Sequence, residues 1–415
     1  MRSNDQHIYG TWRGEVEDCG LRPDSRENWQ RIVNKAVRMP MSDLLFETGK
    51  PVFVKHHSRL TAITRPLSKS HVENIIGWIT KTNSVVFELN GGQDHDSGFT
   101  ISDIERQDDY GVALRHRFRL NLTPVLFEGG IGFQGIARYF NPIVPTCESI
   151  GLEPEIIEYA TPEQGGVGFL GPVGSGKSSS GAAVIRHVLE GKTNIRGHIA
   201  TYEAPIEYEF DLIESNCCTI TQVEIPVNLP TFGRGARNSL RRATNGVMVQ
   251  EMRDRETIEA ATELMATGCP LWTTGHANKV AVAFARFMQK FPENLQAQAF
   301  YGLIANMRLF VSQRLVRHKL WTPENPKMTC LREWQAIDDD LRVKLEEAGP
   351  EKHVRVLQQF IDAGDLKQDV RASRSMRKTI RMKYQAGEIS EETGHQMLIT
   401  YGYHARDLEG KVHER

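Results

Sequence analysis

The segment Gly171-Pro172-Val173-Gly174-Ser175-Gly176-Lys177-Ser178, followed by Ser179, combines three glycines with a lysine and serines. It matches the pattern G-x-x-x-x-G-K-[ST] in full. Glycines let the backbone wrap a phosphate closely, and successive N–H groups then form a nest for the anion. A helix N-terminus adds its positive end, and Lys177 is expected to reach the β- and γ-phosphates. The segment predicts a nucleoside triphosphate site with Ser178 as an Mg²⁺ ligand, the alternative being a glycine-rich turn with a chance lysine.

Short apolar runs alternate with helical segments on both sides of this loop. The runs that resemble strands are 165–170, 198–202, 246–250 and 271–274, and the helical segments are 178–189 and 254–267. Such alternation is typical of an α/β fold, a parallel sheet with crossover helices. Ligands of these sheets bind at the carboxyl ends of the strands, where the candidate residues below are found.

Three polar residues follow the predicted strands directly. Hydrolysis needs carboxylates that hold Mg²⁺ and position water, and Glu251 and Glu203 are the candidates for both tasks. His276 follows the next strand and could sense the γ-phosphate or polarise the water. The alternatives are a helix-start acid for Glu251, a loop acid paired with a surface base for Glu203, and a buried core histidine for His276.

Arginines are the remaining ingredient of phosphoryl transfer, because they neutralise the charge that develops on the phosphate. Arg117 and Arg119 alternate along one predicted strand and should point to one face. Arg237 and Arg241 are four residues apart and would share a helix face. An ordinary surface arginine is the alternative for each of them.

The chain divides by composition into five parts. We expect an N-terminal extension over 1–38, a small α+β domain over 39–152, a linker over 153–164, the α/β core with the phosphate loop over 165–320 and a helical C-terminal region over 321–415. Within the α+β domain, residues 70–82 are typical of an amphipathic helix. Short strand-like segments lie at 52–54, 85–89, 117–122 and 131–139.

Composition argues against several classes of protein. The 415 residues carry a formal net charge of -1, which disfavours a dedicated nucleic-acid binder. No apolar stretch approaches the roughly 18 residues of a membrane span, and the polar N-terminus lacks the apolar core of a signal peptide. The six cysteines include no CxxC pair, so a structural zinc is not expected. Cys217 and Cys218 are read as free thiols, with a redox pair as the alternative.

Four ordered motifs together resemble the secretion and pilus motor ATPases, which include the PilT-type retraction ATPases. The loop at 171–178 has the Walker A form of that family, and Thr201-Tyr202-Glu203-Ala204-Pro205-Ile206-Glu207 resembles its acidic box T-I-E-D-P-I-E. Gln250-Glu251-Met252-Arg253-Asp254-Arg255-Glu256-Thr257 resembles its Walker B region, usually G-E-M-R-D-x-E-T, and Thr274-Gly275-His276-Ala277 its His box. Upstream, Ser42-Asp43-Leu44, Gly49-Lys50-Pro51 and Arg117-Phe118-Arg119-Leu120-Asn121 resemble the family's PAS-like N-terminal domain.

The resemblance implies a RecA-like P-loop core and a homohexameric ring that hydrolyses ATP with Mg²⁺. Glu251 matches the catalytic glutamate, Glu203 leads the acidic box, and Arg117, Arg119, Arg237 and Arg241 stand at arginine positions. Such a ring would act in the cytoplasm, recruited to the inner face of the inner membrane by membrane and coupling components of a secretion system. No sequence-specific contact with nucleic acid is expected.

The chain departs from the family pattern at three positions. Ala204 replaces the usual Asp of the acidic box, Gln250 replaces the Gly before the catalytic glutamate, and Val223 stands where an arginine is usual. These changes distance the chain from pilus retraction motors. The variant Tyr202-Glu203-Ala204-Pro205 and the charged C-terminal extension resemble the DotB-type ATPases of Dot/Icm-like type IV secretion and IncI-type plasmid transfer. The alternatives are a pilus retraction motor, a nucleotide-gated scaffold without hydrolysis and, more distantly, a small-molecule kinase.

Basic residues recur every three or four positions near the C-terminus, at Arg371, Arg374, Arg377, Lys378, Arg381 and Lys383. This stripe could support peripheral association with anionic lipid or an acidic partner. A solvated helix face is the alternative.

Overall fold

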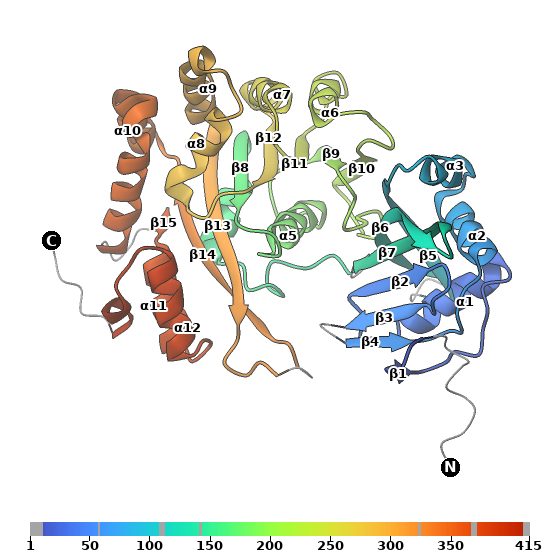
Figure 1. Cartoon of the computed structure of the whole chain (residues 1–415). Coiled ribbons are helices and arrows are strands. Elements are labelled where there is room, and N and C mark those ends of the chain that lie inside the picture. The colour runs from blue at the N-terminus through green and yellow to red at the C-terminus, as the bar shows by residue number, and fades with distance from the viewer. Residues whose placement is uncertain are drawn as a thin grey trace. The chain divides into compact units, whose positions relative to one another are not determined.

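The computed structural model describes residues 11–56, 59–107, 113–140, 143–322, 325–366 and 372–409. The chain forms two compact units (Figure 1). One consists of Met1–Ile143 with Pro205–Glu209, and the other of Val144–Ala204 with Phe210–Arg415. The excursion Pro205–Glu209 belongs to the N-terminal unit although it lies within the sequence of the second unit.

The N-terminal unit is an α+β domain with a seven-stranded sheet in the order β1-β4-β3-β2-β7-β6-β5. Its strands are β1 (Glu15–Val16), β2 (Asp43–Glu47), β3 (Phe53–His56), β4 (Arg59–Ala62), β5 (His95–Gln107), β6 (Ala113–Phe127) and β7 (Gly130–Phe140). Its helices are α1 (Arg26–Ala36), α2 (Lys69–Thr80) and α3 (Ser84–Asn90). Phe118, Leu120 and Leu122 alternate along β6 and are all buried, so this face of the sheet forms the core.

The helices of this unit follow from local sequence. Val72, Ile75, Ile76 and Ile79 lie on the buried face of α2, as their spacing predicts, and Ser68 closes the start of the helix with a capping box. The segment 85–89 differs from expectation, because it lies within helix α3 and not in a strand. Short apolar runs do not distinguish a helix turn from a strand.

For residues 11–38, the structure corrects the expectation of an N-terminal extension over 1–38. Residues 11–38 are described, and helix α1 packs in the core of the unit with Trp29, Ile32 and Val33 fully or almost fully buried. Strand β1 pairs with β4 in parallel. The single apolar face of α1 is short and surrounded by charged residues, so only its packing partners reveal it as core.

The second unit has an eight-stranded sheet in the order β10-β9-β11-β12-β8-β13-β14-β15 (Figure 1). Its strands are β8 (Gly165–Leu170), β9 (Gly197–Glu203), β10 (Cys218–Glu224), β11 (Gly246–Glu251), β12 (Pro270–Gly275), β13 (Met307–Arg317), β14 (Met328–Ala336) and β15 (Ser373–Arg374). The pairs from β10 to β13 are parallel, whereas β14 runs antiparallel to β13 and to β15. This confirms the α/β class with a RecA-like core.

The helices of this unit lie before, between and after its strands. They are α4 (Pro154–Ala160), α5 (Lys177–Leu189), α6 (Phe232–Ser239), α7 (Arg255–Ala266), α8 (Ala283–Met288), α9 (Glu293–Asn306), α10 (Asp339–Leu366), α11 (Met376–Gln385) and α12 (Glu391–Thr400), with 3-10 turns η2 (Val280–Val282) and η3 (Ala405–Glu409). Helix α10 is kinked at Gly349, whose φ is 64°. Within the described residues, no helix combines the length and the apolar character that crossing a membrane requires.

Two expected boundaries also differ from the structure. The linker 153–164 contains helix α4, whose Ile156 and Ala160 are buried. The region 321–415 is not purely helical, because β14 and β15 extend the sheet of the ATPase core. Both segments are held by packing against the sheet, and neither carries a strong periodic signal of its own.

Candidate functional site

The phosphate-binding loop joins the end of a fully buried strand, β8, to the start of helix α5. Gly174 and Gly176 have φ angles of 74° and 84°, which side-chain-bearing residues rarely adopt. Gly171 has a φ of 146°, and a Cβ there would come within 2.3 Å of the Gln313 carbonyl oxygen. These three positions require glycine, so the loop has the shape that the motif predicts.

The Lys177 ammonium lies within this loop. Its Nζ donates to the carbonyl oxygens of Gly171 at 2.9 Å and of Pro172 at 2.8 Å. Gly176 takes the N-cap position of α5, so no cap side chain covers the start of that helix. The loop therefore combines a cation with a helix N-terminus, which is the physical requirement for holding phosphate.

Gln313 contacts the phosphate loop, although it lies outside the motifs in the sequence. This buried residue of β13 donates from Nε2 to the Ser175 carbonyl oxygen at 2.8 Å. Its Oε1 accepts from the Ser180 hydroxyl on α5 at 3.0 Å. The sequence hint to its role is a glutamine inside the largely buried strand Met307–Arg317, because a buried amide needs hydrogen-bond partners.

Glu203 and Glu251 lie at the carboxyl ends of neighbouring parallel strands, β9 and β11. Glu203 is 3% exposed, and its carboxylate accepts from the Thr201 hydroxyl at 2.6 Å and from Gln222 Nε2 at 3.1 Å. The buried carboxylate of Glu203 therefore has neutral hydrogen-bond donors among its partners. A loosely placed loop acid would not have this environment.

Glu251 and His276 approach each other from adjacent strands. Glu251 Oε1 lies 3.6 Å from His276 Nε2, and their side chains are 34% and 53% exposed. The N-cap of α7 is Asp254, so Glu251 is not the acid that starts this helix. His276 is too exposed to be a core histidine. Both side chains remain accessible at the edge that carries the phosphate loop.

The donor set at this edge fits Mg²⁺, which prefers hard oxygen ligands and a site it shares with substrate phosphates. Ser178 lies in the first turn of α5, after β8, while Glu203 and Glu251 end two strands of the same sheet. Among the described residues, no group of three or more His, Cys, Asp or Glu side chains forms a self-contained metal site. The arrangement therefore suits an ion that arrives with a nucleotide.

The predicted arginines are divided between the two units. Arg117 and Arg119 share a face of β6, and Arg117 Nε donates to the Ile206 carbonyl oxygen of the acidic box at 3.2 Å. Arg119 is exposed. Arg241 lies beyond the end of α6, and not on the helix with Arg237 as expected, because α6 ends at Ser239. Arg241 precedes β11, so it lies toward the opposite end of that strand from Glu251.

A cavity of about 360 Å³ adjoins the phosphate loop. Its lining includes Gly176, Ser179, Ser180, Cys330, Arg332 and Lys383. Ser179 directly follows the residue that would hold Mg²⁺, so this cavity is next to the candidate phosphate site. The mixed polar and apolar lining suits a base with its ribose.

The family profile described as "Type II/IV secretion system protein" matches residues 152–401. The chain belongs to this family. The type IV pilus ATPase PilU of Pseudomonas aeruginosa is 30% identical over 291 residues, which cover 69% of this chain and 70% of that protein. The pilus retraction ATPase PilT of the same organism is 31% identical over 207 residues, covering 50% of this chain and 56% of that protein.

Solved structures support the same membership. The X-ray structure of the Legionella pneumophila ATPase DotB superposes with a TM-score of 0.78 at 30% identity, covering 94% of this chain and 100% of that chain. The pilus retraction motor PilT with bound ADP superposes with a TM-score of 0.72 at 23% identity, covering 89% and 96% of the two chains. The likeness to PilT shows a shared fold, and the likeness to DotB supports the secretion and pilus motor family.

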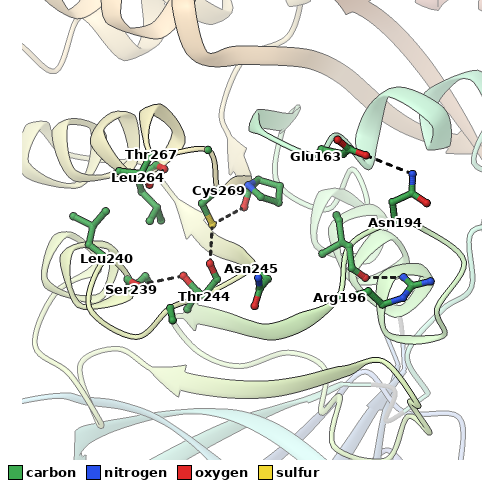
Figure 2. A pocket seen from close by; sticks show the side chains of 14 residues that line it. Glu163, Asn194, Arg196, Ser239, Leu240, Thr244, Asn245, Leu264, Thr267 and Cys269 are labelled. Atoms are coloured by element: carbon green, nitrogen blue, oxygen red, sulfur yellow. Dashed lines mark hydrogen bonds between the residues drawn. The ribbon is translucent and has the colours of Figure 1, made fainter.

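A second cavity of this secretion-family chain lies at the opposite ends of the parallel strands, where the strands begin. It measures about 450 Å³ and is lined at the amino ends of β9, β11 and β12 by residues that include Arg196, Asn245 and Cys269 (Figure 2). The Cys269 thiol is directed at the carbonyl oxygens of Thr244 and Pro270. Neither Lys177 nor either candidate acid lines this cavity, so it is separate from the nucleotide site.

Proposed function

We propose that this chain is an Mg²⁺-dependent ATPase that converts ATP and water to ADP and phosphate. The observation that carries the proposal is that these groups lie together at the carboxyl ends of the parallel strands. The phosphate loop follows β8, and Glu251 and His276, 3.6 Å apart, follow β11 and β12. Several relatives are named as ATPases, which supports the same activity here.

The residues divide the task by position. The loop N–H groups and Lys177 hold the β- and γ-phosphates, and the adjoining cavity takes the nucleoside. Glu251 orients a water and accepts its proton as the water oxygen bonds to the γ-phosphorus and the bond to ADP breaks. His276 orients Glu251 or contacts the γ-phosphate. When bound by Ser178, Glu203 and Glu251, Mg²⁺ supplies charge neutralisation on the phosphates.

We propose further that the enzyme works as a homohexameric ring that powers a type IV secretion or conjugative transfer apparatus. The likeness to DotB, with a TM-score of 0.78 over 94% of this chain, supports this role, and the sequence similarity to PilU keeps pilus retraction as the alternative. The ring would lie in the cytoplasm and be recruited to the inner membrane by components of that apparatus. Loss of transfer with intact twitching in a deletion strain would favour this role, and the reverse would favour retraction.

The decisive experiment is phosphate release from ATP–Mg²⁺ by the wild-type protein and by Glu251→Gln, with the mass of each followed by light scattering. We expect a hexamer whose hydrolysis falls at least about 100-fold in the variant, by analogy with other losses of a group acting on the reacting atoms. Glu263→Gln is the matched control, because Glu263 is an exposed acid on α7.

Two outcomes would contradict the proposal. A wild-type protein that binds ATP but releases no more phosphate than Glu251→Gln would be a nucleotide-gated scaffold. Transfer of the phosphoryl group to a small acceptor, with none to water, would indicate a kinase. Release of phosphate without any acceptor separates hydrolysis from both.

A further inference from the structure

Gln250 occupies an irregular position at the end of β11. Val249 pairs with Thr273 of β12, but the next partner of β12, Thr274, pairs with Glu251. Gln250 is therefore the extra residue of a β-bulge. Bulges often re-aim the side chain that follows them, and here that side chain is the candidate catalytic acid.

Two hydrogen bonds tie this bulge to both neighbouring strands. The side-chain Oε1 of Gln250 accepts from the Ala204 N–H at 2.5 Å, one residue after β9 ends. The main-chain oxygen of Gln250 accepts from the Thr274 hydroxyl of β12 at 2.6 Å. Because β9, β11 and β12 are consecutive in the sheet, Gln250 joins all three strand ends.

These bonds set the spacing of the acids. Ala204 directly follows Glu203, and Gln250 directly precedes Glu251, so the bond between Ala204 and Gln250 links the two carboxylate-bearing positions. The bond to Thr274 links the same bulge to the strand that leads to His276, which Glu251 approaches to 3.6 Å. A change in the Gln250 side chain would loosen β9 from β11 without touching the phosphate loop.

We propose that Gln250 is a positioning residue for hydrolysis, whose amide holds the ends of β9 and β11 in register so that Glu251 meets the attacking water. This inference rests on the proposed ATPase activity. The bond runs from the main-chain N–H at position 204 to the side chain of Gln250, one of the departures from the family pattern. A glycine at 250 has no side chain with which to make that bond.

The test compares Gln250→Met with Gln250→Glu in the full-length protein. Methionine keeps the length of the side chain but removes the acceptor, so we expect kcat to fall roughly 10- to 100-fold with a KM for ATP within about twofold. Glutamate keeps an acceptor oxygen for the Ala204 N–H and should retain more activity. Its added charge should move the acidic limb of the pH–rate profile to higher pH, since like charges disfavour ionisation.

Gln335→Met is the matched control, because Gln335 is a buried glutamine of β14 whose Nε2 donates to the Ala336 carbonyl oxygen. A purely structural Gln250 would lower the melting temperature and leave kcat and the pH profile as in this control. That result would overturn the inference. If the wild type releases no phosphate, the proposed function fails first; if it does and Gln250→Met turns over normally, the inference alone fails.

A double-mutant comparison tests the pairing even if Gln250→Met does not fold. Ala204→Pro removes the main-chain N–H that donates to Gln250, and Gln250→Gly removes the acceptor, so each single change breaks the same bond. We expect each single change to reduce kcat and the double variant to exceed the product of the two single effects by at least about threefold. Effects that simply multiply would mean that positions 204 and 250 act independently, and the inference would be rejected.

Discussion

At the scale of single residues, the phosphate loop depends on a side chain outside its own motif. Gln313 uses both ends of its amide, one on the Ser175 carbonyl oxygen and one on the Ser180 hydroxyl. Each partner flanks the residues that would contact phosphate and Mg²⁺. A buried amide with two partners holds the loop in shape before any nucleotide binds.

Gln313→Leu should therefore weaken ATP binding. Removing the amide leaves a buried carbonyl oxygen and a hydroxyl without this partner, a cost of about 1–3 kcal/mol. If about half of that cost falls on the nucleotide-binding shape, the Kd for ATP rises roughly 2- to 12-fold. Titration calorimetry on the variant and on Gln335→Leu measures this. A Kd equal to that of the control would show that Gln313 serves stability alone.

At the scale of elements, a buried ion pair joins the segment before α4 to the sheet. Arg332 of β14 and Glu153 are 3.0 Å apart, with side chains 2% and 12% exposed. Arg332 also donates to the carbonyl oxygens of Ile150 and Gly151. The guanidinium thereby satisfies a turn that has little other regular structure, and it lines the cavity that adjoins the phosphate loop.

Arg332→Met should destabilise the second unit by about 3–5 kcal/mol, because it leaves the Glu153 carboxylate buried without its cation. Arg255→Met should cost under about 1 kcal/mol, since the Arg255–Glu259 pair is 47% and 44% exposed. Urea unfolding followed by tryptophan fluorescence compares them. Equal costs would mean that the Arg332 pair is as dispensable as a surface pair.

The sheet of the N-terminal unit contains a buried histidine whose charge matters for stability. Burial lowers the pKa of His116, against the opposing effect of Asp103, and the positive charges of Arg106 and Arg38 lower it further. Its Nδ1 is 3.1 Å from the Tyr139 hydroxyl. Because the pKa is lower in the folded state, the contribution to stability is complete above the unfolded value of about 6.5.

The N-terminal unit should lose this contribution as the pH falls through the lowered pKa of His116. Thermal unfolding between pH 7.5 and pH 5 should show a midpoint that decreases on acidification, with a smaller decrease in His116→Gln. Glutamine can still hydrogen-bond Tyr139 but takes up no proton. Identical pH dependence in the two proteins would refute the role of this histidine.

At the scale of the whole molecule, the charged C-terminal stripe is largely occupied within the chain. Arg374 stacks on Trp334 and pairs with Glu155, Arg377 pairs with Asp365 and lies over Tyr403, and Lys383 pairs with Glu388. Arg371 lies outside the described residues. These contacts tie β15 and α11 to neighbouring elements of the same unit.

The position of Arg241 leads to a prediction about the proposed ring. Arg241 lies before β11, whereas Glu251 ends that strand, so a role for Arg241 in hydrolysis would require it to reach the site of a neighbouring subunit. Mixing Glu251→Gln with Arg241→Ala subunits should then restore part of the hydrolysis that each variant lacks alone. Where an Arg241→Ala subunit, which retains Glu251, lies beside a Glu251→Gln subunit, which retains Arg241, their shared site contains both groups. No recovery on mixing would place Arg241 outside the shared site.

Local sequence was enough for the phosphate loop, the alternating strands and helices and the polar residues at 203, 251 and 276. Each of these depends on interactions between near neighbours, such as glycine torsions, strand ends and helix starts. Local patterns do not predict helix α1 or strands β14 and β15, because only contacts with residues far away in the sequence bury them.

The sequence alone determined that this protein has an α/β core with a phosphate-binding loop, since the backbone torsions and N–H groups of the loop are set by its own residues. Only the tertiary structure decided that Gln313 supports that loop and that Gln250 meets Ala204. The same holds for the separation of Arg241 from Glu251. These contacts join residues at least 46 positions apart or opposite ends of one strand, and register and packing, which no local pattern encodes, bring them together or keep them apart.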